Sequence, residues 1–403
     1  MRGPLVFTVS FGGKHYAIVG IHFELATNLC CDGWTMQVAL MANTAHLTDE
    51  QSMFRFLVVG LLDAQIQVIQ MLPQGASEVA SFAKSMLWQE GLGGHVSRLA
   101  VASLSDQLID QQVSVLHAVD GQLWEPVLHL GRRLHLPVVL SMTSVSQLSQ
   151  VKRLRRRISA NCTAFCVATK SLAKAVSQLV SDSILVEVIP LGVPMPSQFT
   201  GAFSSEIPSI VITGTGCLDE DYQLVLEQLV RLAGQYPDLL LFFEASGGED
   251  QRQIWQAARR FGLHAQCNFI PSRLRRRDWL ADAQMLVVPQ ALGAARSIVL
   301  AAMACGLPVL AQRDPWLDYL RDGQTAWLVD APDSQSWAQL LQRPLEDIDQ
   351  TRCLVASARK WVAEHHTAAM QVAKMVDLYR RVAGEAYPFP TGHRVAGPSS
   401  NSR

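Results

Sequence analysis

The chain has 403 residues, 49% of them hydrophobic and 17% charged, which excludes an intrinsically disordered chain and favours two globular domains. Its 34 basic and 35 acidic residues give a formal charge of −1, which excludes a global field that would attract nucleic acid. The eight cysteines include no CxxC pair, and no run approaches the roughly 20 apolar residues of a membrane-spanning helix. We therefore expect a soluble cytoplasmic protein with reduced thiols and no metal site.

In the first half of the chain, short apolar runs alternate with longer stretches of helical period, and this alternation predicts βαβ units with parallel strands. We expect strands at residues 5–10, 36–41, 113–117, 137–142, 164–168 and 185–189. A helix is expected at residues 21–31, with Gly33 as its C-terminal stop. Residues 1–190 are thus predicted to form one doubly wound, Rossmann-like domain.

The pattern restarts after a proline-rich stretch, residues 191–209, which we interpret as an interdomain linker. Strands are expected at residues 210–213 and 239–244 and near 268, 285 and 309, and helices at 221–236, 251–261 and 357–383. Residues 210–384 are predicted to form a second doubly wound domain, and residues 385–403 a disordered tail. Because such sheets bind ligands beyond the carboxyl ends of their strands, we expect a ligand in a cleft between the domains.

Four motifs follow one another between residues 267 and 333: NFIPS, LADAQMLVVPQ, LAAMACGLPVLAQ and DYLRDGQTAWLVDAPD. Their order resembles the carboxyl-terminal domain of family 4 (group 1) glycosyltransferases. A fainter likeness covers about residues 5–383, including VLHA at 115–118 and VIPLGV at 188–193. The resemblance implies a GT-B-like α/β fold, with an acceptor-side first domain and a nucleotide-sugar-side second domain.

The resemblance also implies charged residues that this chain lacks. In the family an Arg and a Lys hold the donor diphosphate, and two glutamates contact the sugar and the nucleotide. Matching the motifs puts Thr215 and Glu220 at the cation positions, and Gly293 and Ala301 at the glutamate positions. The implied enzyme is a retaining, metal-independent glycosyltransferase without a cofactor, in which most donor-site charges are missing.

Arg296 is the candidate replacement for the missing cations. It stands where the family usually has a glycine, directly before Ser297 at the predicted start of a helix, whose amides attract phosphate. The alternative is a solvated loop side chain that blocks the pocket. Glycine-rich turns are further phosphate-binding candidates, because glycine lets backbone amides approach an anion closely, although plain turns would look the same. These turns hold Gly12, Gly13, Gly214, Thr215 and Gly216.

The sequence assigns no catalytic residue. His117 ends a predicted strand and is a candidate general base, with Asp120 as its candidate partner. The alternative for His117 is a hydrogen-bonded structural histidine.

A basic cluster within residues 151–158, VKRLRRRI, lies on a predicted helix with apolar residues at helical spacing. Its cations are Lys152, Arg153, Arg155, Arg156 and Arg157. Such a helix suits the headgroup layer of an anionic membrane, at the inner face of the cell membrane, but a solvated charged face would have the same composition. A second cluster, RLRRR, covers residues 273–277. The absence of interleaved aromatic residues argues against nucleic acid as the partner.

Two functions follow from these observations. The first is a glycosyltransferase that moves a sugar from a nucleotide-diphosphate sugar to a glycan or lipid-linked acceptor in polysaccharide or glycoconjugate biosynthesis. The second is a non-catalytic GT-B protein that acts as a scaffold or partner subunit of an active glycosyltransferase. A nucleotide-sugar epimerase of similar shape has less motif support.

Overall fold

The computed structural model describes residues 6–11, 14–19, 36–76, 79–91, 96–158, 163–196, 208–214, 219–244, 248–270, 280 and 283–386. The chain divides into two compact units, residues 1–35 and 36–403, and each is described by itself. In the first unit, β1 (Val6–Phe11) pairs antiparallel with β2 (Lys14–Val19) as a hairpin.

The strand expected at residues 5–10 therefore exists, but it does not begin the parallel sheet. Only two residues, both glycine, separate two apolar stretches in the sequence. A connection of two residues joins antiparallel strands, whereas a parallel crossover needs a dozen residues or more. The helix expected at residues 21–31, Gly33, and the candidates Gly12 and Gly13 lie outside the described residues.

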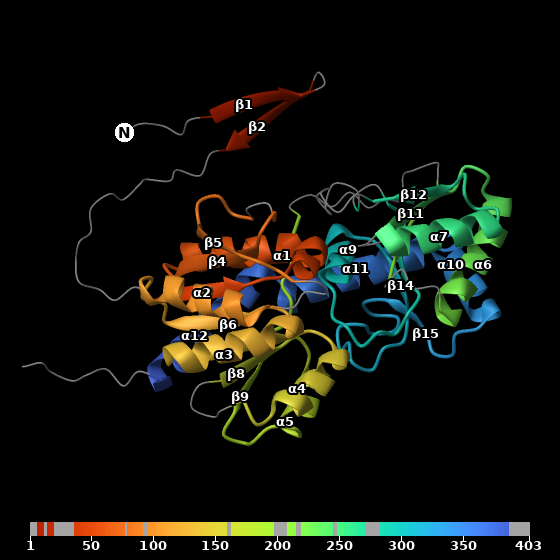
Figure 1. Cartoon of the computed structure of the whole chain (residues 1–403). Coiled ribbons are helices and arrows are strands. Elements are labelled where there is room, and N and C mark those ends of the chain that lie inside the picture. Colours follow the sequence, from red (N-terminus) through yellow and green to blue (C-terminus); the bar gives the residue numbers. More distant parts are fainter. Residues whose placement is uncertain are drawn as a thin grey trace, which may run out of the picture. The chain divides into compact units, whose positions relative to one another are not determined.

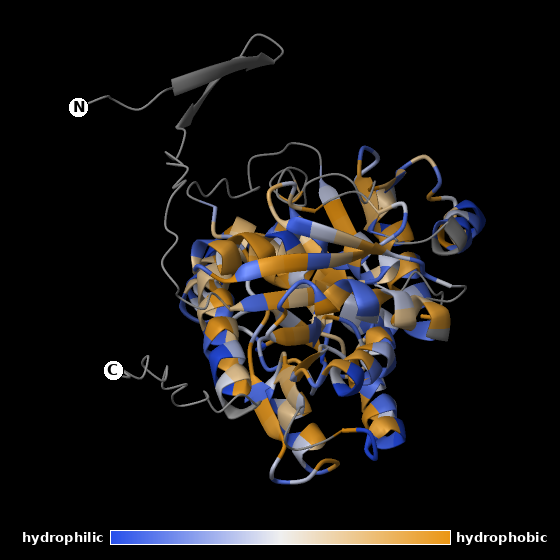
Figure 2. Cartoon of the chain, turned by 60° about the vertical axis from the view of Figure 1, so that its left-hand side comes forward, coloured by the Kyte–Doolittle hydropathy of each residue, from blue (hydrophilic) through white to orange (hydrophobic). Residues whose placement is uncertain are grey.

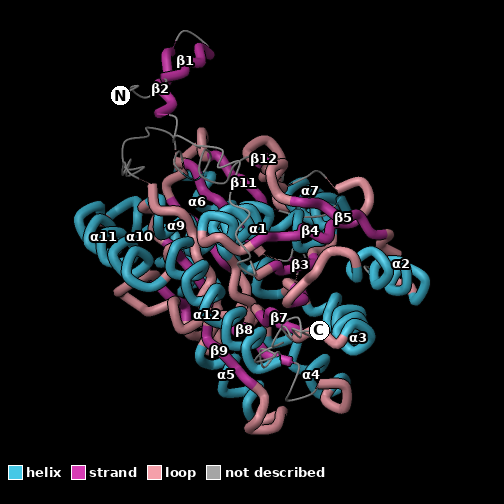
Figure 3. Tube along the Cα trace, turned by 90° about the vertical axis from the view of Figure 1, so that its left-hand side faces the viewer, coloured by secondary structure: helices cyan, strands magenta, loops and turns pink. Residues whose placement is uncertain are grey.

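The second unit begins with a seven-stranded parallel sheet in the order β5-β4-β3-β6-β7-β8-β9 (Figures 1 and 3). Its strands are β3 (Gln37–Met41), β4 (Gln67–Pro73), β5 (Lys84–Trp88), β6 (Val115–Ala118), β7 (Val138–Met142), β8 (Thr163–Val167) and β9 (Leu185–Val188). The strand order reverses between β3 and β6, which is where doubly wound sheets bind ligands. The first predicted Rossmann-like domain is confirmed, with β3 as its first strand and with β4 and β5 as strands that the pattern did not predict.

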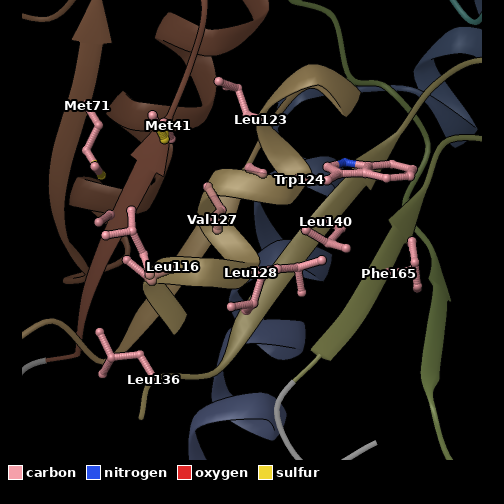
Figure 4. Close-up of a cluster of buried hydrophobic side chains, with 14 of the residues drawn as sticks. Met41, Met71, Leu116, Leu123, Trp124, Val127, Leu128, Leu136, Leu140 and Phe165 are labelled. Carbon is pink, nitrogen blue, oxygen red and sulfur yellow. The ribbon is translucent and has the colours of Figure 1, made fainter. Parts of the chain in front are cut away.

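The helices that accompany this sheet from the same part of the chain are α1 (Thr44–Asp63), α2 (Arg98–Ile109), α3 (Trp124–Leu134), α4 (Leu148–Leu154) and α5 (Lys170–Ser177). Helix α3 packs its apolar face on the strands, where Val127 and Leu128 lie over the sheet (Figure 4). Trp124 meets the Phe165 ring edge to face, with centroids 5.7 Å apart. The helix comes close because Gly131 has no Cβ, which would lie 2.3 Å from a Val138 methyl carbon.

The second domain contains a six-stranded parallel sheet in the order β12-β11-β10-β13-β14-β15. Its strands are β10 (Ser209–Thr213), β11 (Leu240–Glu244), β12 (Cys267–Phe269), β13 (Met285–Val288), β14 (Val309–Gln312) and β15 (Trp327–Val329). Figure 2 shows hydrophobic residues gathered on the strands, as expected for sheets covered by helices. The second doubly wound domain is therefore confirmed.

The helices of this part are α6 (Glu220–Gln235), α7 (Gly248–Arg260), α9 (Ser297–Cys305), α10 (Ser334–Glu346), α11 (Ile348–His365) and α12 (Ala368–Ala386). The single helix expected at residues 357–383 is two helices, because the chain crosses between the domains at His366 and Thr367. There Val193 donates its N–H to the His366 carbonyl at 2.8 Å. Helix α12 then packs on the first domain, burying Leu378 and Tyr379.

Candidate functional site

The candidate site lies where the loop after β13 meets the loop after β7. The Val145 N–H donates to the Gly293 carbonyl at 2.8 Å, and the Ala295 N–H donates to the Thr143 carbonyl at 2.7 Å. Between them Ser144 and Ala294 form an antiparallel bridge. The two domains are thus joined by backbone hydrogen bonds between loops that follow the carboxyl ends of strands in both sheets.

Gly293 fits this junction because it has no side chain. Its φ of +61° lies in the left-handed region that favours glycine, and an added Cβ would lie 2.4 Å from Val145 Cγ1. Its N–H donates to Asp314 Oδ2 at 2.6 Å. The position that the resemblance matches to a donor-site glutamate therefore has no room for a side chain in this arrangement of the domains.

Arg296 is held by the carboxyl ends of two strands of the second domain. Its Nη2 lies 2.8 Å from Glu244 Oε2 at the end of β11, and Nη1 donates to Thr213 Oγ1 at 2.5 Å and to the Gly214 carbonyl at 3.3 Å. The side chains of Arg296 and Glu244 are only 17% and 14% exposed. Arg296 is therefore a fixed, largely buried cation and not a solvated loop side chain.

Ser297 begins α9, and its partner comes from the first domain. The Ser297 N–H donates to Glu50 Oε1 at 3.1 Å, and the Ser297 hydroxyl donates to Glu50 Oε2. Glu50 interrupts the helical geometry of α1, with φ −126° and ψ 24°. Its carboxylate thereby meets the positive end of the α9 dipole.

The glycine-rich turn after β10 is described only at its first residue. Gly214 is closely packed, because an added Cβ would lie 2.8 Å from Gln290 Oε1 and 2.9 Å from the Tyr222 ring. Thr215 and Gly216 lie outside the described residues. Phosphate binding by this turn stays a prediction.

His117 is buried, with 1% of its surface exposed, and both ring nitrogens have partners. Nδ1 lies 2.6 Å from the Tyr379 hydroxyl of α12, and Nε2 lies 2.7 Å from Ser141 Oγ. Burial, with a smaller contribution from the nearby His46, lowers the pKa of His117 to about 3. Both ring nitrogens are therefore engaged within the protein, and a role of His117 as general base stays a prediction.

Asp120 has partners other than His117. Its Oδ1 accepts hydrogen bonds from Asn43 Nδ2 at 3.1 Å and from the Gln122 N–H at 2.8 Å. Asn43 also caps α1, since its side chain accepts from the His46 N–H. Asp120 thus braces the loops after β3 and β6, and its proposed partnership with His117 stays a prediction.

The cations of the basic cluster fall into two groups. Arg153 and Arg157 form ion pairs with Glu125 of α3 and line a groove between α3 and α4, together with His129 and Arg132. Lys152, Arg155 and Arg156 are exposed. Residues 273–277 lie outside the described part of the chain.

The described residues contain neither a membrane-spanning helix nor a metal-binding cluster. No helix there is long and apolar enough to cross a membrane. No group of three or more His, Cys, Asp or Glu side chains in that part of the chain is arranged to hold a metal ion.

The residues that sequence reasoning missed are Glu244, Thr213 and Glu50. The first two end the expected strands at residues 239–244 and 210–213, so the rule that ligands bind at carboxyl ends of strands could have found them. Glu50 carries no such signal, because it lies within a helical segment and meets Ser297 only through the packing of two domains.

The chain is similar to known glycosyltransferases over part of its length. Residues 207–347 match the family model described as "Glycosyl transferases group 1". A D-inositol 3-phosphate glycosyltransferase of Corynebacterium urealyticum is 25% identical over 186 residues, which cover 44% of each chain. The alignment thus spans less than half the length of this curated relative.

Solved structures share the fold over nearly the whole chain. Anabaena HepE, whose crystal structure holds UDP and glucose, has a TM-score of 0.68 at 12% identity and covers 86% of this chain and 100% of its own. Sucrose-phosphate synthase from Thermosynechococcus elongatus has a TM-score of 0.66 at 17% identity and covers 86% of this chain and 99% of its own. The fold is that of the GT-B glycosyltransferases.

Proposed function

We propose that this chain, whose residues 207–347 form a group 1 glycosyltransferase domain within a GT-B fold, transfers a sugar from a nucleotide-diphosphate sugar. The observation that carries the proposal is the position of Arg296. Its guanidinium is fixed at the carboxyl ends of β10 and β11, and its backbone precedes the first amide of α9. A cation beside a helix N-terminus is a suitable environment for a diphosphate.

The chemistry of donor cleavage explains why this cation matters. Breaking the bond between sugar and diphosphate leaves additional negative charge on the leaving group, and fixed positive charge stabilises it. The Arg296 guanidinium donates three hydrogen bonds, two from Nη1 and one from Nη2. Because a guanidinium has five N–H donors, the Nε donor and one Nη2 donor are not used by these bonds. In our proposal these donors and the α9 amides meet the donor phosphates.

The acceptor is proposed to be a glycan or a lipid-linked glycan at an anionic membrane surface, in polysaccharide or glycoconjugate biosynthesis. The basic cluster supports this location, because Lys152, Arg155 and Arg156 are exposed beside the groove that Arg153 and Arg157 line. Glu125 offsets part of the charge of the latter two. Peripheral binding would place the first domain, the acceptor side, next to the membrane.

A second candidate function is a non-catalytic GT-B subunit that supports an active glycosyltransferase. The observation that favours it is Gly293, which leaves no side chain at a position where the resembling family has a glutamate and which packs directly against Val145. In this alternative the interdomain junction is permanent and a protein partner binds elsewhere on the surface.

The experiment that separates the two functions is a calorimetric titration of the protein with UDP, GDP and their sugar conjugates. The enzyme proposal predicts saturable binding of at least one nucleotide below millimolar concentration. Absence of binding at millimolar concentrations of every nucleotide would exclude it in favour of the non-catalytic alternative.

A further inference from the structure

Glu50 makes a contact between the domains that the proposed function does not explain. It belongs to α1 of the first domain, and its carboxylate accepts hydrogen bonds from the backbone N–H and the hydroxyl of Ser297 in the second domain. Ser297 is the first residue of α9, and the preceding Arg296 provides no side-chain cap to that helix. Helix α9 thus receives no side-chain cap from its own preceding residue. Glu50, which belongs to the other domain, provides that cap.

The same chemistry would recognise a phosphate. The first amides of a helix carry partial positive charge and have no partner within the helix, so they bind carboxylate and phosphate oxygens in the same way. The Glu50 carboxylate accepts hydrogen bonds from the first amide of α9 and from the adjacent hydroxyl. It therefore occupies the place from which a phosphate oxygen would bind.

The charges around this helix end also oppose a second anion. Arg296 is the cation of the site, and Glu244 is its ion-pair partner at 2.8 Å. With Glu50 in place, this group of three side chains has one positive and two negative charges. A nucleoside diphosphate would therefore bring further negative charge next to the Glu50 and Glu244 carboxylates as long as Glu50 stays in contact with Ser297.

We infer that Glu50 is an internal anion that competes with the donor's phosphate for the N-terminus of α9. This inference rests on the proposed function, because it concerns the same phosphate site. Donor binding then requires the Glu50 contact to break, and the interdomain junction loses both hydrogen bonds between Glu50 and Ser297 at that step. The affinity for the donor is set partly by the free energy of this intramolecular contact.

The test compares Glu50→Gln with a matched control, Glu90→Gln. Glutamine keeps the size of the side chain and removes its charge. Glu90 makes an equivalent contact at another helix, since its carboxylate accepts from the N–H of Thr44, at 3.2 Å, and from the Thr44 hydroxyl at the start of α1. Each substitution therefore weakens the cap of one helix, α9 for Glu50→Gln and α1 for Glu90→Gln. Only Glu50→Gln removes the anion from the N-terminus of α9.

UDP and inorganic pyrophosphate are the two probes, titrated into the full-length wild type and both variants. We expect Glu50→Gln to bind each probe at least threefold more tightly than wild type, and Glu90→Gln to bind as wild type does. Equal affinity of wild type and Glu50→Gln for both probes, or no pyrophosphate binding by either, would overturn the inference.

The two probes also distinguish this inference from the proposed function. Tighter pyrophosphate binding by Glu50→Gln without binding of any nucleotide would support the competition and refute nucleotide-sugar transfer. UDP binding by wild type, together with equal affinities of wild type and Glu50→Gln for both probes, would support the proposed function and refute the competition.

Discussion

Gly293 of the second domain and Val145 of the first are in such close contact that a Cβ on the glycine would lie 2.4 Å from Val145 Cγ1. The contact lies beside the hydrogen bond from the Val145 N–H to the Gly293 carbonyl. Gly293 is therefore constrained both by its left-handed φ and by the neighbouring domain.

Substitution Gly293→Ala should destabilise the protein by more than the backbone conformation alone requires. A left-handed residue with a Cβ costs roughly 1–2 kcal/mol, and the overlap with Val145 adds to that cost. The control is Gly323→Ala, because Gly323 has φ +67° and no atom within 4 Å of an added Cβ. Thermal unfolding of both variants checks this. Equal losses of stability would show that the contact with Val145 does not constrain the glycine.

Substitution Tyr379→Phe should leave Nδ1 of the buried His117 without its partner at 2.6 Å. Leaving a buried polar group unpaired costs about 1–3 kcal/mol, so we expect the free energy of unfolding to fall by that amount. Urea denaturation measures it. A change below about 0.5 kcal/mol would mean that the hydrogen bond contributes little to the docking of α12.

His117 should also make stability depend on pH. Its pKa is about 3 in the folded protein, below the usual 6.5, so between these values the unfolded chain binds more protons. The contribution of His117 is therefore fully present above pH 6.5 and is lost as the pH falls toward 3, by up to about 1.4 kcal/mol per pH unit. Urea denaturation of wild type and His117→Gln at pH 7 and pH 5 tests this. A pH dependence that is the same in both proteins would contradict it.

The sequence predicts the architecture better than the site. Alternating apolar runs correctly indicated two doubly wound sheets, because buried parallel strands consist of nearly continuous apolar residues. Strand β4 escaped this pattern because it contains Gln70, a buried polar residue whose side chain bonds the Ala80 carbonyl at 2.8 Å and the Ala80 N–H at 3.2 Å. A buried but hydrogen-bonded glutamine cannot be told from an exposed one in the sequence.

In the site too, the sequence predicts residues that belong to a local motif, but not the distant residues that contact them. The motifs located Arg296 and Gly293, because each stands at a fixed distance from a small-residue helix. Their partners Glu244 and Val145 depend on how strands and domains meet, and the sequence has no local pattern for that. The neighbours that decide whether Arg296 is solvated or fixed are 52 and 83 residues away.

Substitution Glu244→Gln should change stability and anion binding in opposite directions. Removing the partner of a largely buried cation destabilises the fold, by about 1–3 kcal/mol for a hydrogen-bonded charge that is still partly exposed. The same change leaves the positive charge of Arg296 uncompensated, so pyrophosphate should bind more tightly. Thermal unfolding and calorimetric titration give the two readouts. Weaker pyrophosphate binding would indicate that Glu244 positions Arg296 rather than neutralising it.

The basic cluster predicts salt-dependent binding to anionic membranes. Reversing three exposed cations in Lys152→Glu, Arg155→Glu and Arg156→Glu should abolish flotation with vesicles that contain anionic lipid, since each basic residue near such a surface contributes about 1 kcal/mol. Arg352→Glu and Lys360→Glu on α11 are the control, because they reverse exposed cations elsewhere. Failure of the wild type to float with these vesicles would leave a solvated charged face as the explanation.

The central claim is that Arg296 is the cation that meets the donor diphosphate, and titration of UDP into Arg296→Ala tests it most directly. Arg313→Ala is the matched control, because Arg313 belongs to the same domain and pairs with Asp322 and Asp330 at the surface. Loss of a charged hydrogen-bond donor corresponds to about 1.5–3 kcal/mol, or roughly 10- to 100-fold in affinity. We predict a loss of this size for Arg296→Ala and less than about twofold for Arg313→Ala. Unchanged UDP affinity in Arg296→Ala would contradict the account.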